Sequence, residues 1–371
     1  MMREVIFQGA KLRVARLING WTKADLAENL QVSRQFIHAL EIDEKPASQD
    51  MVAALSLLLR VQPSFFFEPL SNEVREDECH FRSRKSMPDK VADQVISIGT
   101  VLEILVRFLD QKLELPVNSF PSIEAHSTEE IEQAAEDCRK QWGLGAGPIA
   151  NMCRVLENAG AIVTLFSGSR HEVDALSMAR ARPLVIRNTL KQSPGRQRFD
   201  LAHECAHLVI HQGISTGDEL TENQANRFAS AFLMPKNTFD REFPAMPSRL
   251  DWQAIYSLKV RWRVSAKAIL RRAYDLDLID AIQYQAGNRF LNQSGQAKTE
   301  RFDEKISFEE PELLKTAIAT YIQAFSSTPA DLSSQLGMSP ALIEQLVGKT
   351  IFREISKNMA MALPTISQES Q

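Results

Sequence analysis

The chain has 371 residues, more than one hydrophobic core normally serves, so we expect two or three domains. Its composition is that of an ordinary soluble protein, with 44% hydrophobic and 24% charged residues, and it has no apolar run long enough to span a bilayer. The net charge of −4 argues against a non-specific nucleic-acid coat but leaves room for a local DNA-binding face. The chain starts without a signal peptide and its four cysteines form no C-x-x-C pair, so we expect a cytoplasmic protein with reduced thiols.

Residues 8–67 have the pattern of a compact helical unit. Thr22 and Ser33 are good N-caps for two short helices at 23–30 and 34–42, and apolar residues at helical spacing predict further helices on either side. Two short helices joined by so tight a turn are typical of a helix-turn-helix, whose second helix enters the major groove of DNA.

The stretch T-K-A-D-L-A-E-N-L-Q-V-S-R-Q-F-I-H-A-L-E, residues 22–41, closely resembles the lambda-repressor-like (XRE) family, which implies a five-helix DNA-binding domain. Arginine and glutamine offer the paired donors and acceptors that base edges require. The residues placed to read bases are Ser33, Arg34, Gln35 and His38, and the candidates for phosphate contact are Lys23 and Lys45. Because residues 1–62 hold eight basic and seven acidic side chains, a protein-binding helix-turn-helix with solvated polar residues is the alternative. If it binds DNA, we expect two copies to share a two-fold site as a homodimer.

A long amphipathic helix is predicted from Asp89 to about Leu113, with an apolar stripe that should dock on the following domain or on a second subunit. Ser127 opens a capping box and a helix that runs to Trp142. Another helix is expected at 149–158.

Three short apolar runs at 161–166, 173–178 and 183–186 predict a small antiparallel sheet, with a turn at Gly168 and Ser169. Such a sheet can hold an extended peptide by its edge. Basic residues gather after it, which indicates a solvated surface or a contact with an acidic ligand or partner: Arg180, Arg182, Arg187, Lys191, Arg196 and Arg198.

The stretch F-D-L-A-H-E-C-A-H, residues 199–207, places the pattern H-E-x-x-H in a predicted helix. Residues four apart lie one above the other on a helix, so His203 and His207 can bind one metal ion. Glu204, next to the first histidine, can reach a water at that metal and take its proton, as in zinc hydrolases.

A catalytic zinc usually has a third protein ligand, and Glu222 at the start of the next predicted helix is our candidate. Small residues along that helix, Ala225 and Ala229, would let it approach the first closely. Asp218 and Glu219 are competing carboxylates, and Glu222 could instead complement the helix dipole. His211 continues the row of histidines but fits a hydrogen-bonded or capping role better, and Cys205 fits a buried apolar one.

The sequence R-F-D-L-A-H-E-C-A-H-L-V-I-H, followed by E-x-x-A-N-x-F-A-x-x-F-L-M-P, resembles the ImmA/IrrE family of metallopeptidases. The resemblance implies a gluzincin-like core that binds zinc and cleaves repressor proteins. It carries the metal ligands over to His203, His207 and Glu222 and the general base to Glu204. The pair Cys205-Ala206 departs mildly from the larger residue and glycine usual in that family.

The C-terminal part begins with a cationic helical stretch at 258–272, which would cover the site or contact DNA phosphates. Residues 328–346 then repeat the cap and core spacing of 22–40, with Pro340 and Ala341 in place of Arg34 and Gln35. The repeat is either a coincidence of helix-pair geometry or a degenerate helix-turn-helix that packs instead of binding DNA. Residues after Ala362 are predicted to be disordered.

We therefore expect a mainly α fold with a small antiparallel sheet, an α+β arrangement of four parts. These are a helix-turn-helix domain at 1–70, a linker and long helix at 71–125, a metallopeptidase domain at 126–285 and a helical region at 286–371. The functional hypothesis is a transcriptional regulator that binds a DNA operator and uses zinc to cleave a repressor-type protein, or its own linker near 68–82. The alternatives are a transcription factor whose peptidase-like domain only senses a ligand or stress, and an antitoxin-like binding module.

Overall fold

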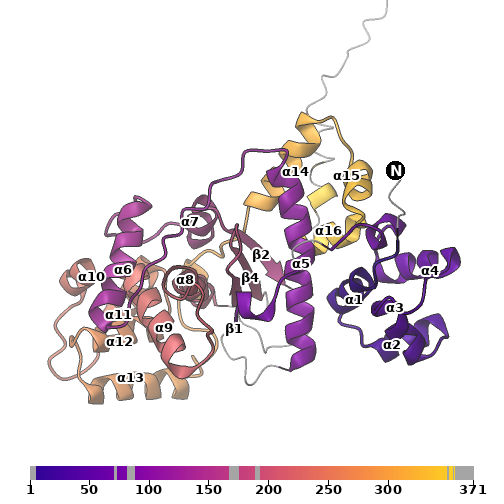
Figure 1. Ribbon diagram of the computed structural model, residues 1–371. Helices are drawn as coiled ribbons and strands as arrows, with labels where there is room; N and C mark the ends of the chain where they lie inside the picture. Colours follow the sequence, from indigo (N-terminus) through magenta and orange to yellow (C-terminus); the bar gives the residue numbers. More distant parts are fainter. Residues whose placement is uncertain are drawn as a thin grey trace, which may run out of the picture. The chain divides into compact units, whose positions relative to one another are not determined.

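The structure is a computed structural model that describes residues 6–70, 73–81, 88–166, 175–188, 193–348, 351–353 and 355. It is mainly helical with one four-stranded sheet, which confirms the expected fold class (Figure 1). None of the helices described is both long enough and apolar enough to cross a membrane. The predicted turn at Gly168 and Ser169, the basic residue Lys191 and the tail after Ala362 lie outside the described residues.

The chain divides into two compact units that do not follow the order of the sequence. Unit 1 comprises Met1–Arg75, Pro88–Leu115 and Leu314–Gln371. Unit 2 comprises Glu76–Met87 and Pro116–Leu313. The N-terminal helices, the long helix and the C-terminal helices thus share one unit, and the H-E-x-x-H helix and the sheet share the other.

Unit 1 begins with four α-helices and a short 3-10 helix. The pair α2 and α3 is joined at Gln31, which ends α2 in the left-handed conformation with φ of 55°. Thr22 forms a full capping box with Asp25 and Ser33 accepts from the Phe36 N–H, as helix N-caps do. The elements are α1 (Gly9–Ile18), α2 (Lys23–Leu30), α3 (Arg34–Glu41), α4 (Gln49–Leu59) and η1 (Pro63–Phe66).

The long helix α5 (Asp89–Asp110) packs against α1 inside unit 1, whereas we expected it to dock on the peptidase-like domain or on a second subunit. Its Gln94 amide donates to the Ile18 carbonyl at 3.2 Å, and its Thr100 hydroxyl accepts from the Val74 N–H at 3.1 Å. The prediction of an apolar stripe on this helix is therefore confirmed, but the stripe packs within unit 1, against α1.

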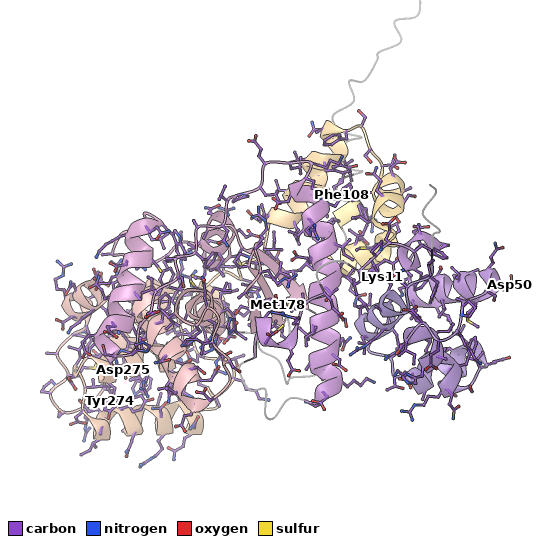
Figure 2. The ribbon with its side chains drawn as sticks, in the orientation of Figure 1. Lys11, Asp50, Phe108, Met178, Tyr274 and Asp275 are labelled. Atoms are coloured by element: carbon purple, nitrogen blue, oxygen red, sulfur yellow. The ribbon has the colours of Figure 1, made fainter. Side chains whose placement is uncertain are left out.

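Three C-terminal helices complete unit 1: α14 (Leu313–Ala324), α15 (Pro329–Leu336) and α16 (Pro340–Val347). Phe108 of α5, labelled in Figure 2, meets Tyr321 of α14 with ring centroids 5.1 Å apart. The turn between α15 and α16 bonds to the end of the N-terminal module, where the Gln62 N–H donates to the Gly337 carbonyl at 2.8 Å. The two helix pairs of this unit are thus joined through backbone hydrogen bonds.

The sheet of unit 2 contains β1 (Cys79–Phe81), β2 (Ile162–Phe166), β3 (Ala175–Met178) and β4 (Leu184–Asn188). Its strand order is β1-β3-β4-β2. The expectation of an antiparallel sheet was wrong for one pairing, because β2 runs parallel to β4. The strands β2 and β3 do not form a hairpin, since β2 lies on the far side of β4. The strand β1 was not predicted at all, because its partner lies about a hundred residues further along the chain.

Helices α6 to α13 surround the core of unit 2, and α8 is central to it because nearly all of its residues are buried. The close contact between α8 and α9 is possible because Ala225 and Ala229 of α9 are small and fully buried. The helices are α6 (Thr128–Gln141), α7 (Met152–Asn158), α8 (Pro194–Ile210), α9 (Glu219–Leu233), α10 (Lys236–Glu242), α11 (Trp252–Trp262), α12 (Ala266–Asp275) and α13 (Ala281–Gln293).

Two of the basic residues that we predicted on a solvated surface are buried inside unit 2. Arg187 and Arg198 are buried, and both contact Glu309. Arg187 donates to the Glu309 backbone carbonyl, and Arg198 forms an ion pair with the Glu309 carboxylate. In the stretch 258–272, Lys259 is fully buried between Glu300 and Asp303. These cations hold the segment that contains Glu300, Asp303 and Glu309 against the rest of unit 2. The prediction of a solvated basic surface was therefore wrong for Arg187 and Arg198, and the expected contact of the stretch 258–272 with DNA phosphates does not hold for the buried Lys259.

Candidate metal centre

Helix α8 brings His203 and His207 together as the spacing of the motif predicts. The helix begins at Pro194, a residue favoured at the first helical position, and continues without a further proline or glycine after Gly195. Both imidazole rings are at most 1% exposed, and their Nε2 atoms lie 3.1 Å apart. Two ring nitrogens that face each other so closely can both bind one metal ion.

Glu222 on α9 supplies the third candidate ligand. Helix α9 begins three residues before Glu222 and is capped by Asp218, which accepts from the Thr221 N–H, so this competing carboxylate is used as a cap. The Glu222 carboxylate lies 3.2 Å from His203 Nε2 and 3.5 Å from His207 Nε2. The candidate ligand atoms of the three residues are all within 4.8 Å of one another.

The charge states of this cluster suit a cation. Burial lowers the pKa of His207 to about 3, so its ring is neutral at physiological pH. Burial alone would raise the pKa of Glu222, but His203 and His207 beside the carboxylate lower it to about 2. Metal ligands have to be deprotonated. Glu222 Oε1, the atom 3.5 Å from His207 Nε2, is buried and has no hydrogen-bond partner among the described residues, and such a carboxylate oxygen suits a bound cation.

Each ligand ring is oriented by a second polar side chain. His203 Nδ1 lies 3.0 Å from Asn226 Oδ1, and His207 Nδ1 lies 2.9 Å from His211 Nδ1. His211 in turn contacts Gln224 Oε1 through its Nε2 at 2.9 Å. With the two amide oxygens accepting, both ligand rings carry their proton on Nδ1 and present a free lone pair on Nε2. This is the usual way in which outer residues orient metal-binding histidines.

His211 therefore has both roles that the sequence suggested, since it is hydrogen-bonded and forms the C-cap of α8. Cys205 is fully buried among apolar residues, and burial raises the pKa of its thiol, so it is an inert core residue. The orienting residues Asn226 and Gln224 were missed by the sequence analysis. A signal was available for Asn226, which is four residues from Glu222 and so lies on the same helical face.

Glu204 follows His203 on α8 and is buried, and its carboxylate accepts a hydrogen bond from the Ser177 hydroxyl at 2.7 Å. Ser177 is on β3 and is fully buried, which fixes the carboxylate from the side of the sheet. The residue was not predicted. Its signal was a single hydroxyl within an otherwise apolar strand, A-L-S-M.

A fourth histidine, His80 of β1, also reaches this centre. Its ring stacks on that of His207, with centroids 5.2 Å apart and an interplanar angle of 7°. His80 Nδ1 lies 3.0 Å from the Thr216 hydroxyl, and the ring is only 2% exposed. Nothing in the local sequence around residue 80 indicated a position near the H-E-x-x-H helix.

In unit 1 the predicted recognition residues lie on the outside of α3. Arg34, Gln35 and His38 are exposed, while the Ser33 hydroxyl is occupied in capping the helix. The two predicted phosphate contacts differ: Lys45 is exposed and lies over the Phe36 ring, whereas Lys23 is half-buried, 3.0 Å from His38 Nδ1 and 3.5 Å from Glu41.

Two family models match the chain. Residues 12–66 match a helix-turn-helix family, and residues 157–274 match the IrrE N-terminal-like domain, a peptidase family. The first match runs from within α1 to the end of η1. The second includes β3, α8 and α9, and therefore every residue described at the candidate centre except His80. Both resemblances seen in the sequence are confirmed. A search of curated proteins found no match to the chain.

Proposed function

We propose that this chain, which joins an XRE-type helix-turn-helix domain to an IrrE N-terminal-like domain, is a transcriptional regulator with a zinc-dependent peptidase centre. Its substrate would be a repressor-type protein or its own linker near 68–82. The observation that carries the proposal is the convergence of His203, His207 and Glu222 on one point, with Glu204 next to His203 on the same helix.

Two imidazole nitrogens and one carboxylate are the donor set of a catalytic zinc site, which leaves one position open. Zinc bound there would lower the pKa of a water molecule and polarise a peptide carbonyl. The protein would provide the rest. Asn226 and His211 hold the rings in the tautomer that presents Nε2, and Ser177 holds the Glu204 carboxylate in place.

Glu204 is the proposed general base. Its carboxylate would take a proton from the attacking water and then pass that proton to the nitrogen of the leaving amine. The Ser177 hydroxyl donates to Oε2 of this carboxylate and so helps to hold it in one position. A fixed position matters because proton transfer needs the acceptor within hydrogen-bond reach of the water.

The helix-turn-helix would place α3 in the major groove, with Arg34 and Gln35 at the base edges. Lys45 would contact a phosphate. Because one such module covers only a half-site, we propose that two copies of the chain bind a two-fold operator as a homodimer.

The proposed activity is tested with the full chain in its wild-type and Glu204→Gln forms, both loaded with zinc. Incubation with candidate repressors of the same genome, followed by intact-mass spectrometry, should reveal a new fragment pair from a repressor or from the chain itself. The fragments should be absent with Glu204→Gln although this variant still binds zinc. Cleavage by both forms, or by neither, would contradict the proposal.

A second candidate function is a ligand sensor, and a cavity in unit 2 favours it. The cavity has a volume of about 920 Å³ and is lined by Gln224 and Asn226, the residues that orient His211 and His203. A small molecule bound there would change the metal centre through these amides. Normal regulation by Glu204→Gln would favour the sensor, because a pure sensor does not need the general base.

A further inference from the structure

The cavity of about 920 Å³ in unit 2 borders the side chains that orient the histidines of the candidate metal centre. Asn226 Oδ1 lies 3.0 Å from His203 Nδ1, and Gln224 Oε1 lies 2.9 Å from His211 Nε2. Both amides line the cavity, whereas none of the described lining residues is a candidate metal ligand or Glu204. The cavity therefore meets the supports of the histidines and not the place where zinc and a substrate peptide would meet.

The size and the lining of the cavity suit a small organic molecule. Ligand sites in proteins commonly enclose roughly 300–1,000 Å³ and combine apolar walls with a few polar groups. The apolar and aromatic residues of this lining include Ile131, Phe199, Leu220 and Tyr284. A ring or an alkyl group of a ligand can be buried against them.

The charged side chains of the lining favour an anion. The four basic residues are Arg196, Arg227, Lys267 and Arg271, and the two acidic residues are Asp200 and Asp275. Asp275, labelled in Figure 2, pairs with Arg271 at 2.9 Å and with Arg227 at 3.5 Å, so its charge is already used. With four basic and two acidic side chains, the lining has two positive charges in excess.

Two of these cations have no carboxylate partner among the described residues. The Lys267 side chain is exposed and forms no ion pair with any of them, and Arg196 donates instead to the backbone carbonyl of Ala297. Charge-assisted hydrogen bonds from lysine and arginine to a carboxylate or phosphate are stronger than those between neutral groups. Lys267 and Arg196 are therefore the side chains of the lining best placed to attract an anion.

The two amides connect the cavity to the metal centre. With their oxygens accepting from the histidines, their nitrogens remain as donors, and neither nitrogen has a hydrogen-bond partner among the described residues. An anion in the cavity can accept from them. Hydrogen bonds in a chain polarise one another, so an amide that donates to an anion becomes a better acceptor at its oxygen. The anion would thus strengthen the hold of Asn226 on His203 and of Gln224 on His211.

We propose that this cavity binds a small organic anion, with a carboxylate or phosphate group and an apolar part, and that the bound anion tightens metal binding at His203, His207 and Glu222. The second half of this inference rests on the zinc centre proposed above. Histidines that are held more firmly with Nε2 toward the metal are better ligands. By linkage, zinc tightens binding of the anion by the same factor.

Anion binding is tested with the metal-free full chain by isothermal titration calorimetry. Phenyl phosphate and benzoate are the probes and distinguish a phosphate from a carboxylate ligand, and benzyl alcohol is the neutral control. At least one anion should bind, about tenfold or more tightly than the alcohol. Lys267→Gln should weaken its binding by about tenfold, because a charged hydrogen bond is lost. Lys236→Gln, at an exposed lysine outside the cavity, should leave it unchanged.

The anion site would be overturned if neither probe bound, if benzyl alcohol bound as tightly as the anions, or if Lys267→Gln kept the wild-type affinity. The zinc centre would be untouched by any of these results, because zinc binding is measured separately.

The regulation is tested by zinc affinity, measured by competition with a chromophoric chelator in the presence and absence of the anion. The anion should raise the zinc affinity of the wild type by about fivefold or more. At the same concentration it should have little effect on Lys267→Gln. An equal effect on both forms would mean that the anion binds the metal directly, and an unchanged or lower affinity would also overturn the regulation. A chain that binds the anion but no zinc would overturn the zinc centre and leave only the anion site.

Discussion

The proposed recognition helix of unit 1 and the candidate metal centre of unit 2 hold their side chains in opposite ways. Arg34 and Gln35 of α3 are exposed, as residues must be if a partner outside the chain is to order them. His203 and His207 are at most 1% exposed, and each contacts a second side chain through the nitrogen that faces away from the centre. Contacts to DNA can be arranged on binding, whereas a metal site has to be held in place beforehand.

This contrast leads to separable effects of substitution. Changes on α3 should alter binding to DNA and leave the metal content unchanged. Changes at the centre should alter metal binding, and this should hold also for substitutions of residues that do not contact the metal.

The largest effect is expected for Glu222→Gln, which keeps the size of the side chain but removes the negative charge of the third ligand. Zinc affinity should fall by more than the roughly 10–100-fold that the loss of a supporting residue causes. Competition with a chelator measures this. DNA binding should be unchanged, and a variant that keeps wild-type zinc affinity would exclude Glu222 as a ligand.

The next largest effect is expected for His211→Ala, which removes the acceptor of the hydrogen bond from His207 Nδ1–H. Zinc affinity should decrease by about 10–100-fold, because His207 loses its orientation and becomes less basic. The exposed histidine variant His126→Ala is the control. Equal affinity of the two variants would show that His211 is only a helix cap.

A smaller effect is expected for Arg34→Ala on the recognition helix. Loss of a paired contact to a base should weaken binding to a selected operator by about 1–3 kcal/mol and relax the preference at one position. Lys45→Ala should instead weaken binding to all sequences alike, because it removes a phosphate contact. Fluorescence anisotropy at fixed salt distinguishes the two. Identical sequence preferences for wild type and Arg34→Ala would contradict a base-reading role.

Within unit 1 the second helix pair sharpens the comparison. Thr328 forms a capping box with Asp331 and Ser339 caps α16, as Thr22 and Ser33 do in the first pair. Here, however, Gly337 of the turn packs against the N-terminal module and bonds to Gln62. We infer that this pair has a packing role and does not read DNA.

The smallest effect therefore concerns stability. A Cβ atom at Gly337 would lie 3.0 Å from the Phe65 backbone, and the residue has φ of +66°. Gly337→Ala should destabilise unit 1 by about 1–3 kcal/mol. Gly143→Ala, at φ of +63° with no atom nearby, should show only the smaller cost of the backbone conformation. Urea unfolding measures both, and equal destabilisation would mean that the turn does not pack on Phe65.

Local features of this chain could be predicted from its sequence, and long-range features could not. The caps at Thr22, Ser33 and Ser127 and the placement of His203 and His207 follow from spacings of a few residues. The prediction of Glu222 as a third ligand required only the further assumption that two neighbouring helices pack closely through small residues.

The predictions that were wrong or missing concern contacts between segments that are far apart in the sequence. The strand β1 and His80 lie about a hundred residues before their partners, and Arg198 is buried because it meets Glu309, more than a hundred residues later. The parallel pairing of β2 with β4 depends on how the chain crosses the sheet. Hydrophobic periodicity indicates which face of a strand or helix is buried but does not identify the segment that packs against it.

The most direct test of the central claim is the metal content of the purified full chain, measured by mass spectrometry for the wild type and for His203→Ala. We predict about one zinc per wild-type chain and almost none in the variant. A wild-type chain that binds no metal even when zinc is supplied, or a variant that retains it, would contradict a zinc centre at His203, His207 and Glu222.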